Sequence, residues 1–359
     1  MKIGSVNLSQ PFALAPMAGM TDTAFRRLVK RRGGCGLVVT EMVSSEGLVR
    51  GIDRTLEYAE YTEEERPVSI QIFGGDPVKM ADAAQIVEGM GADIVDINMG
   101  CPVPKIAKHN AGCSLMREPE HAQAVVAAMA RAVRIPVTVK MRAGWNEHSI
   151  NAPDLARMVE DAGASAVAVH GRTAAQSYSG QSDWSLIDRV AESVGIPVFG
   201  SGDCLEPEDI IARMATGVSG VLVGRGVLRN PWILAQAADL AAGKPARSVT
   251  LEDRGQFLLQ YMDLLLSEEN EPSGFRHRAG ESAAGGGEPT SLAQRSRHER
   301  WVINKLRALM SWYSKGLHNG GHLRTEINAA GSIAEARDII RRFFAGDHAA
   351  AYSGVELSR

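Results

Sequence analysis

The chain has 359 residues, of which 45% are hydrophobic and 23% are charged, and its formal charge of −3 at pH 7 gives no overall sign of nucleic-acid binding. No apolar run approaches the roughly 18 residues that a membrane span needs, and the first ten residues lack the apolar stretch of a signal peptide. The four cysteines form no Cys-x-x-Cys pair and no His/Cys cluster has metal-ligand spacing, so we expect no metal and a reduced, cytoplasmic setting.

Short apolar runs alternate with helical patterns over the first two thirds of the chain. The expected strands are Phe12–Ala15, Leu37–Thr40, Val68–Ile72, Ile94–Asn98, Val137–Met141, Ala166–His170, Val198–Gly200 and Gly220–Val223. The expected helices are Thr23–Arg32, Pro77–Gly89, Pro119–Ala132, Ala152–Ala162, Trp184–Ser193 and Pro207–Ala215. Near-continuous apolar strands that alternate with helices indicate a parallel sheet covered on both faces.

Eight such strands over about 230 residues match a (β/α)8 TIM barrel better than an open doubly wound sheet. An open sheet of the dinucleotide-binding kind would show G-x-G-x-x-G after its first strand, whereas this strand ends in Pro16-Met17-Ala18-Gly19. We therefore predict a barrel over residues 1–245, with functional residues directly after its strands.

The pattern after residue 245 is all-helical. We expect helices at Leu251–Ser267, from Glu299 onward, and at about Ile333–Phe344. The segment 268–297 is rich in Gly, Ser, Glu and Arg, and we interpret it as a flexible insertion because it offers little apolar surface to bury. The prediction is a small helical domain over 246–345, followed by a tail at 346–359.

Two regions of the chain are strongly basic. Residues 26–32 hold five cations, and 299–345 holds eight Lys or Arg against four acidic residues, a local charge of +4. A run of charge is usually only the solvated face of a helix. On a chain with negative net charge, two such regions are also compatible with an anionic macromolecular partner.

Polar side chains follow nearly every predicted strand, which is expected of a ligand site at the carboxyl end of a barrel. Lys140 and Arg142 share one face of their strand, so they need an anion, an electron-rich ring or a partner carboxylate such as Asp96. The turns Ser201-Gly202-Asp203 and Gly224-Arg225 follow strands seven and eight, where barrels commonly bind phosphate. A single glycine turn is often only a turn. The pair, with Gln71 and Lys140 reaching a ring system, indicates flavin mononucleotide (FMN).

The segment Asp96-Ile97-Asn98-Met99-Gly100-Cys101-Pro102 ends a strand with an amide and a thiol on a stiff turn. Cys101 could be a buried structural cysteine, a nucleophile or a proton donor. No adjacent residue supplies a base, and an ordinary thiol pKa of about 8.5 keeps the group protonated at neutral pH. Beside a flavin we favour the proton donor.

These segments resemble the tRNA-dihydrouridine synthase family, and its bacterial B-type group most closely. The matching segments are Ala15-Pro16-Met17-Ala18-Gly19-Met20-Thr21-Asp22, Thr40-Glu41-Met42, Gln71-Ile72, Asp96 to Pro102, Lys105, Ala111-Gly112, Lys140 to Trp145, His170-Gly171-Arg172-Thr173, Gly202-Asp203 and Gly224-Arg225. The resemblance covers about residues 3–240 and, more loosely, the helical domain.

The resemblance implies an enzyme that reduces the C5–C6 double bond of uridines in tRNA with FMN and NADPH, acting as a monomer. By position, the family's FMN contacts fall on Pro16, Met17, Ala18, Gln71, Lys140, His170, Ser201, Gly202, Asp203, Gly224 and Arg225. Asn98, Arg142 and Arg172 would contact the uridine, and Cys101 would protonate C5. The uridine must leave its stack to reach the flavin, and the basic helical domain would grip the RNA backbone.

The chain departs from the family pattern at Ser201, where asparagine is usual, at Ala174, where arginine is common, at Leu309, in place of a histidine, and in its insertion at 268–297. Two other functions fit part of the pattern. A small-molecule FMN reductase would share the barrel and the cofactor but leave the helical domain unexplained. A non-catalytic RNA-binding protein on a degenerate barrel would not need Cys101, Lys140 and the glycine turns.

Overall fold

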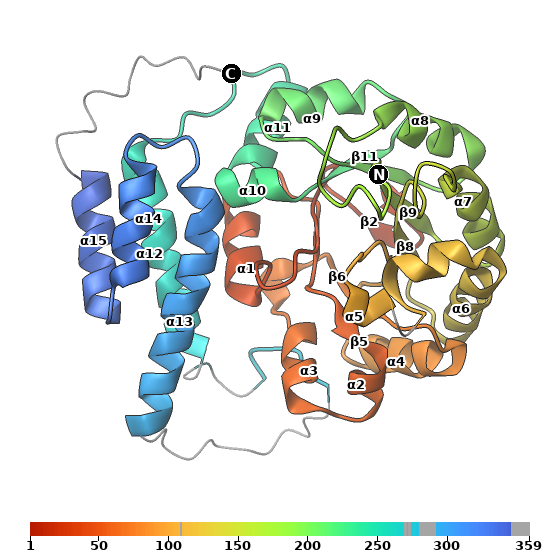
Figure 1. Cartoon of the computed structure of the whole chain (residues 1–359), viewed down its shortest axis with the longest axis horizontal. Coiled ribbons are helices and arrows are strands. Elements are labelled where there is room, and N and C mark those ends of the chain that lie inside the picture. The colour runs from red at the N-terminus through yellow and green to blue at the C-terminus, as the bar shows by residue number, and fades with distance from the viewer. Residues whose placement is uncertain (108–109, 269–270, 272–273, 280–291, 346–359) are drawn as a thin grey trace.

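The computed structural model describes residues 1–107, 110–268, 271, 274–279 and 292–345. Within these residues, eight parallel strands form the closed barrel of Figure 1. The barrel strands are β3 (Phe12–Leu14), β4 (Leu37–Val39), β6 (Val68–Phe73), β7 (Ile94–Met99), β8 (Val137–Arg142), β9 (Ala166–His170), β10 (Val198–Ser201) and β11 (Gly220–Val223). The barrel closes because β11 pairs with β3 and β4 pairs with β6. The predicted (β/α)8 fold is confirmed.

Helices cover the outside of the barrel. They are α1 (Thr23–Arg32), α4 (Pro77–Gly89), α6 (Pro119–Ala132), α7 (Ala152–Asp161), α8 (Trp184–Ser193), α9 (Pro207–Met214), α10 (Arg225–Arg229) and α11 (Ile233–Ala241). Local chemistry starts them where the sequence predicts; the Asp76 carboxylate, for example, accepts the Val78 and Lys79 N–H groups ahead of Pro77. Of the helices in the described ranges, none is long and apolar enough to cross a membrane.

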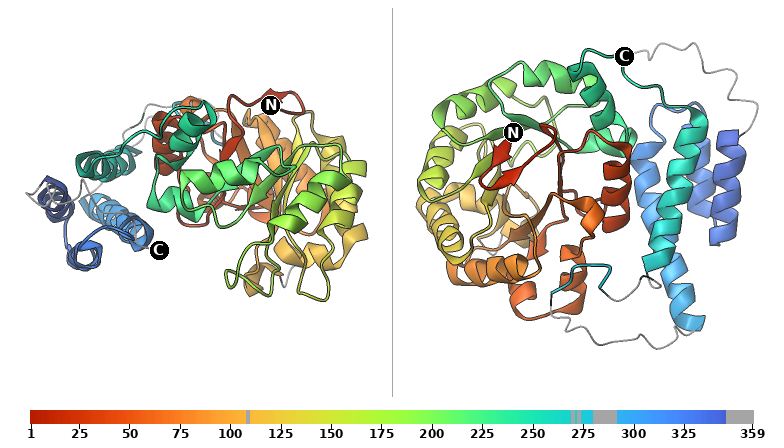
Figure 2. Two further views of the ribbon diagram at one scale, coloured as in Figure 1. Left: turned by 90° about the horizontal axis from the view of Figure 1, so that it is seen from above. Right: turned by 180° about the vertical axis from the view of Figure 1, so that it is seen from behind.

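Several short elements in the connections were not predicted from the sequence. They are β5 (Val43–Ser44), α2 (Ser45–Val49), α3 (Asp53–Ala59) and η1 (Glu63–Glu65) between β4 and β6, and α5 (Pro104–Ala107) and η2 (Gly112–Arg117) after β7. An N-terminal hairpin, β1 (Lys2–Ile3) with β2 (Val6–Asn7), crosses the amino end of the barrel, facing the viewer in the right panel of Figure 2. Ile3 enters the barrel interior with Phe199 and Leu222. The ligand site must therefore lie at the opposite, carboxyl end.

A bundle of four helices packs beside the barrel: α12 (Leu251–Ser267), α13 (Leu292–Tyr313), α14 (Gly320–Ala329) and α15 (Ile333–Ala345). The rings of Phe25 on α1 and Phe257 on α12 meet edge to face, with centroids 6.0 Å apart. In the left panel of Figure 2, α13 and α14 lie on the side away from the N-terminal hairpin. The bundle thus extends the carboxyl side of the barrel.

The expected insertion at 268–297 falls partly outside the described residues. Of its described part, residues 292–297 belong to α13, so this helix begins earlier than expected. His277 stacks on Tyr61 of the barrel, with ring centroids 4.5 Å apart and planes 8° from parallel. The flexibility of the insertion as a whole stays a prediction, because 269–270, 272–273 and 280–291 lie outside the described residues. The division at residue 245 stays a prediction; it falls between α11 and α12.

The first basic region is used inside the fold. Arg26 is 1% exposed, and its guanidinium bonds the Glu65 carboxylate at 2.5 Å and the Thr21 and Glu60 carbonyls at 2.7 Å. Arg27 and Arg31 both pair with Glu64. Arg32 lies over the rings of Trp232 and Phe257. This charge run is therefore structural, and an anionic partner must be sought elsewhere.

We predict that Glu65→Gln lowers the free energy of unfolding by about 3–5 kcal/mol, because it leaves the buried Arg26 charge without its counter-charge. Urea denaturation measures the difference. The matched control is Glu63→Gln, two residues away, whose carboxylate is 67% exposed beside Arg66. It should change stability far less; equal losses in the two variants would contradict the assignment.

Candidate active site

A cavity of about 590 Å³ opens at the carboxyl end of the barrel, within the size range of small-molecule and cofactor sites. Its lining includes most residues that the sequence singles out: Pro16, Met17, Ala18, Gln71, Asn98, Cys101, Lys140, Arg142, His170, Ser201, Gly202, Asp203, Gly224 and Arg225. Arg172 is not among the lining residues. Side chains spread over more than 200 positions of the sequence thus meet in one space.

The turn that carries Cys101 is held by the last residues of β7. The Asn98 Oδ1 atom accepts the backbone N–H groups of Gly100 at 3.1 Å and Cys101 at 2.9 Å. Its Nδ2 atom donates to Gln71 Oε1 at 2.8 Å and contacts Met42 Sδ at 3.6 Å. The Asn98 amide thus holds the turn and also lines the cavity, and its expected contact with uracil stays a prediction.

The Cys101 thiol is half-buried, and that burial raises its pKa above the ordinary value. The nearby Arg142 and Lys140 charges and the Val103 N–H act in the opposite direction but are weaker. The thiol therefore stays protonated at neutral pH. This favours an acid over a thiolate nucleophile.

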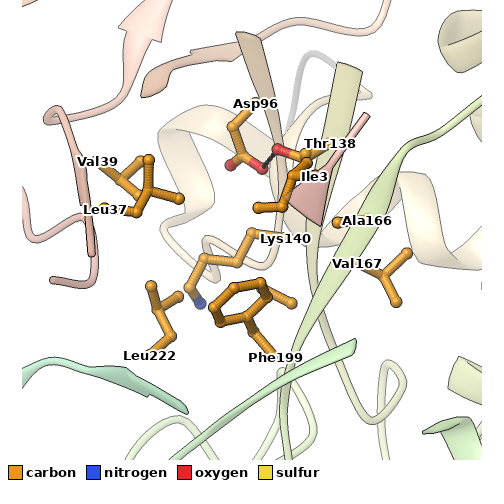
Figure 3. A pocket seen from close by; sticks show the side chains of 11 residues that line it. Ile3, Leu37, Val39, Asp96, Thr138, Lys140, Ala166, Val167, Phe199 and Leu222 are labelled. Carbon is orange, nitrogen blue, oxygen red and sulfur yellow. Dashed lines mark hydrogen bonds between the residues drawn. The ribbon is translucent and has the colours of Figure 1, made fainter. Parts of the chain in front are cut away.

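Among the residues that the structure describes, no carboxylate forms an ion pair with Lys140. As Figure 3 shows, its side chain runs away from Asp96 and ends near Phe199 and Leu222. The Asp96 carboxylate instead accepts the Thr138 hydroxyl at 2.6 Å and the Gln71 Nε2 atom at 2.7 Å. Lys140 Nζ forms no hydrogen bond within the described ranges, and its side chain lines the large cavity. Burial and the Arg142 charge lower the pKa of Lys140 to about 8, so the ammonium form still predominates at pH 7.

The two buried arginines hold the loop that follows β9. Arg142 donates to the Gly100 carbonyl at 2.8 Å and to the Thr173 and Ser177 carbonyls at 2.9 and 2.8 Å. Arg172 donates to the carbonyls of Ser179 and Gly180 and to the carboxylate of Asp203. Arg142 also lines the cavity, whereas Arg172 is not among its lining residues, and the expected contacts of both with substrate stay predictions.

The glycine turns after β10 and β11 form a positively charged corner. Gly202 has a φ of +124°, and a Cβ there would lie 2.2 Å from Ser182 Oγ, so only glycine fits. The Asp203 carboxylate accepts from Arg225 at 3.3 Å and therefore orients that guanidinium. Burial, with the charges of Lys140, Arg142, Arg172 and Arg225, lowers the pKa of His170 to about 2. The imidazole is neutral at physiological pH.

Sequence reasoning missed several lining residues, notably Met42, Tyr178, Cys204 and Trp312. Met42 lies two residues after a predicted strand and belongs to a segment that matches the family, so the sequence pointed to it without assigning it a role. No sequence signal marks Tyr178, which is 60% exposed on the loop after β9. Only the path of that loop brings its side chain to the mouth of the cavity. Trp312 comes from α13, so the helical bundle reaches the cavity mouth, and Lys315 Nζ lies 3.9 Å from its ring centroid.

The second basic region is only partly neutralised. Arg337, Arg341 and Arg342 form ion pairs with carboxylates. Lys305 pairs with Asp22 and Glu41, which ties α13 to the barrel. Arg300, Lys315 and Arg324 are exposed and have no ion pair within the described part of the chain. In that same part, no group of three or more His, Cys, Asp or Glu side chains could hold a metal ion.

Comparison with known proteins identifies relatives of this chain. The profile of the dihydrouridine synthase (Dus) family matches residues 13–284. A probable tRNA-dihydrouridine synthase of Rickettsia bellii is 36% identical over 347 residues, which cover 96% of this chain and 98% of the relative. tRNA-dihydrouridine synthase B of Xanthomonas campestris is 37% identical over 278 residues, covering 77% and 83% of the two chains.

Solved structures support the fold. A morphinone reductase superposes with a TM-score of 0.50 at 12% identity and covers 67% of this chain and 90% of its own. A 2-naphthoyl-CoA reductase gives 0.52 at 12% identity and covers 68% of this chain and 52% of its own. The family profile spans most of the barrel and part of the bundle, and the Rickettsia relative matches nearly end to end, so this chain belongs to the dihydrouridine synthase (Dus) family.

Proposed function

We propose that this protein reduces the C5–C6 double bond of specific uridines in tRNA to 5,6-dihydrouridine, in the cytoplasm, with FMN as cofactor and NADPH as reductant. The observation that carries the proposal is that the Cys101 thiol shares one cavity with the neutral His170 and with the Lys140 ammonium, which forms no ion pair within the described residues. Family membership and the likeness to tRNA-dihydrouridine synthases support tRNA as the substrate.

The residues present fit FMN. Four cations lie around His170, whereas the nearby carboxylates are Asp203, which pairs with Arg172 and Arg225, and Asp96. The cavity wall therefore carries excess positive charge, which suits a phosphate beside Gly202 and Arg225. Lys140, Gln71 and His170 would hold the ring, and Pro16, Met17 and Ala18 would form the wall beside it. When bound, FMN supplies the hydride for C6 after NADPH has reduced it.

Cys101 would then act as the general acid. Its S–H donates a proton to C5 as C6 receives hydride, and the resulting thiolate recovers a proton from solvent. The Asn98 amide holds the turn on which the thiol sits, and Arg142 ties that turn to the loop after β9 through the Gly100 carbonyl. Together these bonds restrict how far the thiol can move from the cavity.

The helical bundle would bind the RNA backbone. Trp312 lies at the cavity mouth, and Lys315 lies beside it. Arg300, Lys315 and Arg324 are exposed and unpaired within the described residues, whereas the cations of α1 are used inside the fold. Cations that are free of carboxylates are the ones that can bind phosphates at low cost.

The first test removes the proposed acid. In cells lacking this gene, wild-type protein and Cys204→Ala should restore dihydrouridine at defined tRNA positions, and Cys101→Ala should not. The purified Cys101→Ala protein should keep its flavin and its reduction by NADPH but form dihydrouridine about 10²- to 10⁴-fold more slowly. Because burial raises the pKa of the Cys101 thiol, deprotonation of this thiol should lower turnover only above the ordinary range of a thiol, whereas loss of the Lys140 charge should lower it from about pH 8.

Cys204 is the matched control because it is a second thiol in the same cavity, with a pKa raised to about 12 by burial. Nucleoside mass spectrometry, mapped by position, reads both experiments. Full activity of Cys101→Ala would remove the proton-donor assignment. Unchanged dihydrouridine in the deletion strain, with no second synthase present, would favour a small-molecule flavoenzyme.

A second prediction concerns Lys140. Lys140→Gln should weaken FMN binding by about tenfold or more, or slow flavin reduction by NADPH, because a charge-assisted contact is lost. The ratio of flavin to protein absorbance after gel filtration measures retention, and stopped-flow bleaching measures reduction. Lys79→Gln, on the outer helix α4, is the control and should alter neither. Unchanged values for both measurements in Lys140→Gln would count against a position at the ring.

A third prediction concerns the RNA. Replacing Arg300, Lys315 and Arg324 together by Gln should weaken tRNA binding and lower the slope of log Kd against log salt by about two to three. The control replaces Lys2, Arg131 and Arg134 by Gln, which removes the same charge at the amino end of the barrel. Equal effects of the two triple variants would mean that only net charge matters.

A further inference from the structure

We propose that Asp96 is a positioning residue for Cys101, which it orients through a directional chain of hydrogen bonds running through Gln71 and Asn98. The inference deepens the proposed function and rests on it for the catalytic consequence, but the geometry stands by itself. Asp96 is 5% exposed, and within the described part of the chain its side chain accepts hydrogen bonds from Gln71 and Thr138 alone. It is not among the residues that line the large cavity.

The residues of this hydrogen-bond network lie on three neighbouring strands. Strand register sets Gln71 of β6 beside Asp96 of β7, and Asp96 beside Thr138 of β8. Gln71 Nε2 donates to Asp96 Oδ2 at 2.7 Å, and Gln71 Oε1 accepts from Asn98 Nδ2 at 2.8 Å. Asn98 Oδ1 then accepts the N–H of Cys101 at 2.9 Å. Every link is within ordinary hydrogen-bond distance.

The direction of this chain depends on the charge of Asp96. An ionised carboxylate can only accept, so the amide N–H of Gln71 must face it and the Gln71 oxygen must face Asn98. That leaves the Asn98 oxygen as the atom that meets the Cys101 N–H. With a neutral amide at position 96, both Gln71 and Asn98 can flip, and a flipped Asn98 would turn N–H groups toward the N–H groups of the turn.

The charge itself is supported by its surroundings. Burial raises the pKa of Asp96 above its ordinary value. The Thr138 hydroxyl and the Gln71 amide, which both donate to the carboxylate, act against that shift, as does the charge of Lys140 on β8. A carboxylate buried this deeply persists only because it is hydrogen-bonded. Removing its charge therefore alters the orientation of the amides without creating a cavity.

The test is Asp96→Asn, read first by the rate at which iodoacetamide alkylates Cys101 as a function of pH. Cys101 is half-buried whereas Cys35, Cys113 and Cys204 are buried, and Cys101→Ala supplies the blank. Loss of the held turn should change the alkylation rate at pH 8 by about tenfold, as expected for a thiol pKa displaced by one unit. Dihydrouridine formation should fall by a similar factor or more, chiefly in kcat.

Two further variants separate positioning from general damage. Thr138→Val removes one hydrogen bond from the same carboxylate but leaves the Gln71 link, and its alkylation profile should stay within about twofold of wild type. Asp96→Asn combined with Gln71→Glu restores the direction, because the new carboxylate at position 71 accepts from both neighbouring amides. This double variant should recover the wild-type alkylation profile; its activity is not used, because Gln71 faces the proposed flavin site.

A wild-type profile and wild-type turnover in Asp96→Asn would overturn the inference, as would equal damage by Thr138→Val. If Asp96→Asn does not fold, the double variant is the deciding test. A wild-type alkylation profile in that variant supports the proposed chain of hydrogen bonds, and an altered profile overturns it. Alkylation needs neither RNA nor NADPH. A protein without dihydrouridine activity would therefore still report on the position of Cys101, which keeps this test separate from that of the proposed function.

Discussion

Closure of the parallel barrel is the constraint on which the rest of the structure depends. Once β11 pairs with β3 and β4 with β6, all eight strands point their carboxyl ends into one opening. The register then pairs Asn98 with Lys140 and Arg142 with His170. Backbone hydrogen bonds, rather than any property of these side chains, bring them within reach of each other.

The electrostatics of the cavity follow from that crowding. Lys140 and the arginines around His170 meet too few carboxylates to balance them, and the low dielectric of the interior strengthens their mutual effect. The imidazole is forced neutral, and the thiol of Cys101 stays protonated because burial outweighs the cations beside it. A site that is positive yet holds neutral proton-carrying groups is suited to bind an anionic cofactor while retaining a proton for transfer.

Buried hydrogen bonds also determine which polar residues remain available to a ligand. Arg172 and Arg142 use their donors on the loop after β9, and Asn98 uses its amide on the Cys101 turn. The same distinction separates the two basic regions: Arg26 is sealed against Glu65, whereas Arg300 is exposed on α13. Residue type alone does not distinguish a charge that supports the fold from one that meets a partner.

The sequence by itself determined the eight barrel strands, the main helices and the residues that follow each strand, because apolar periodicity and helix-capping residues are local properties. It missed elements such as β1 and α3, which are too short to carry a periodic signal. Only the tertiary structure decided that Asp96 binds Gln71 and Thr138 rather than Lys140, that Arg172 binds Asp203 and that Trp312 lines the cavity. These outcomes depend on contacts between residues far apart in the sequence, because such residues come within hydrogen-bond distance only in the closed barrel.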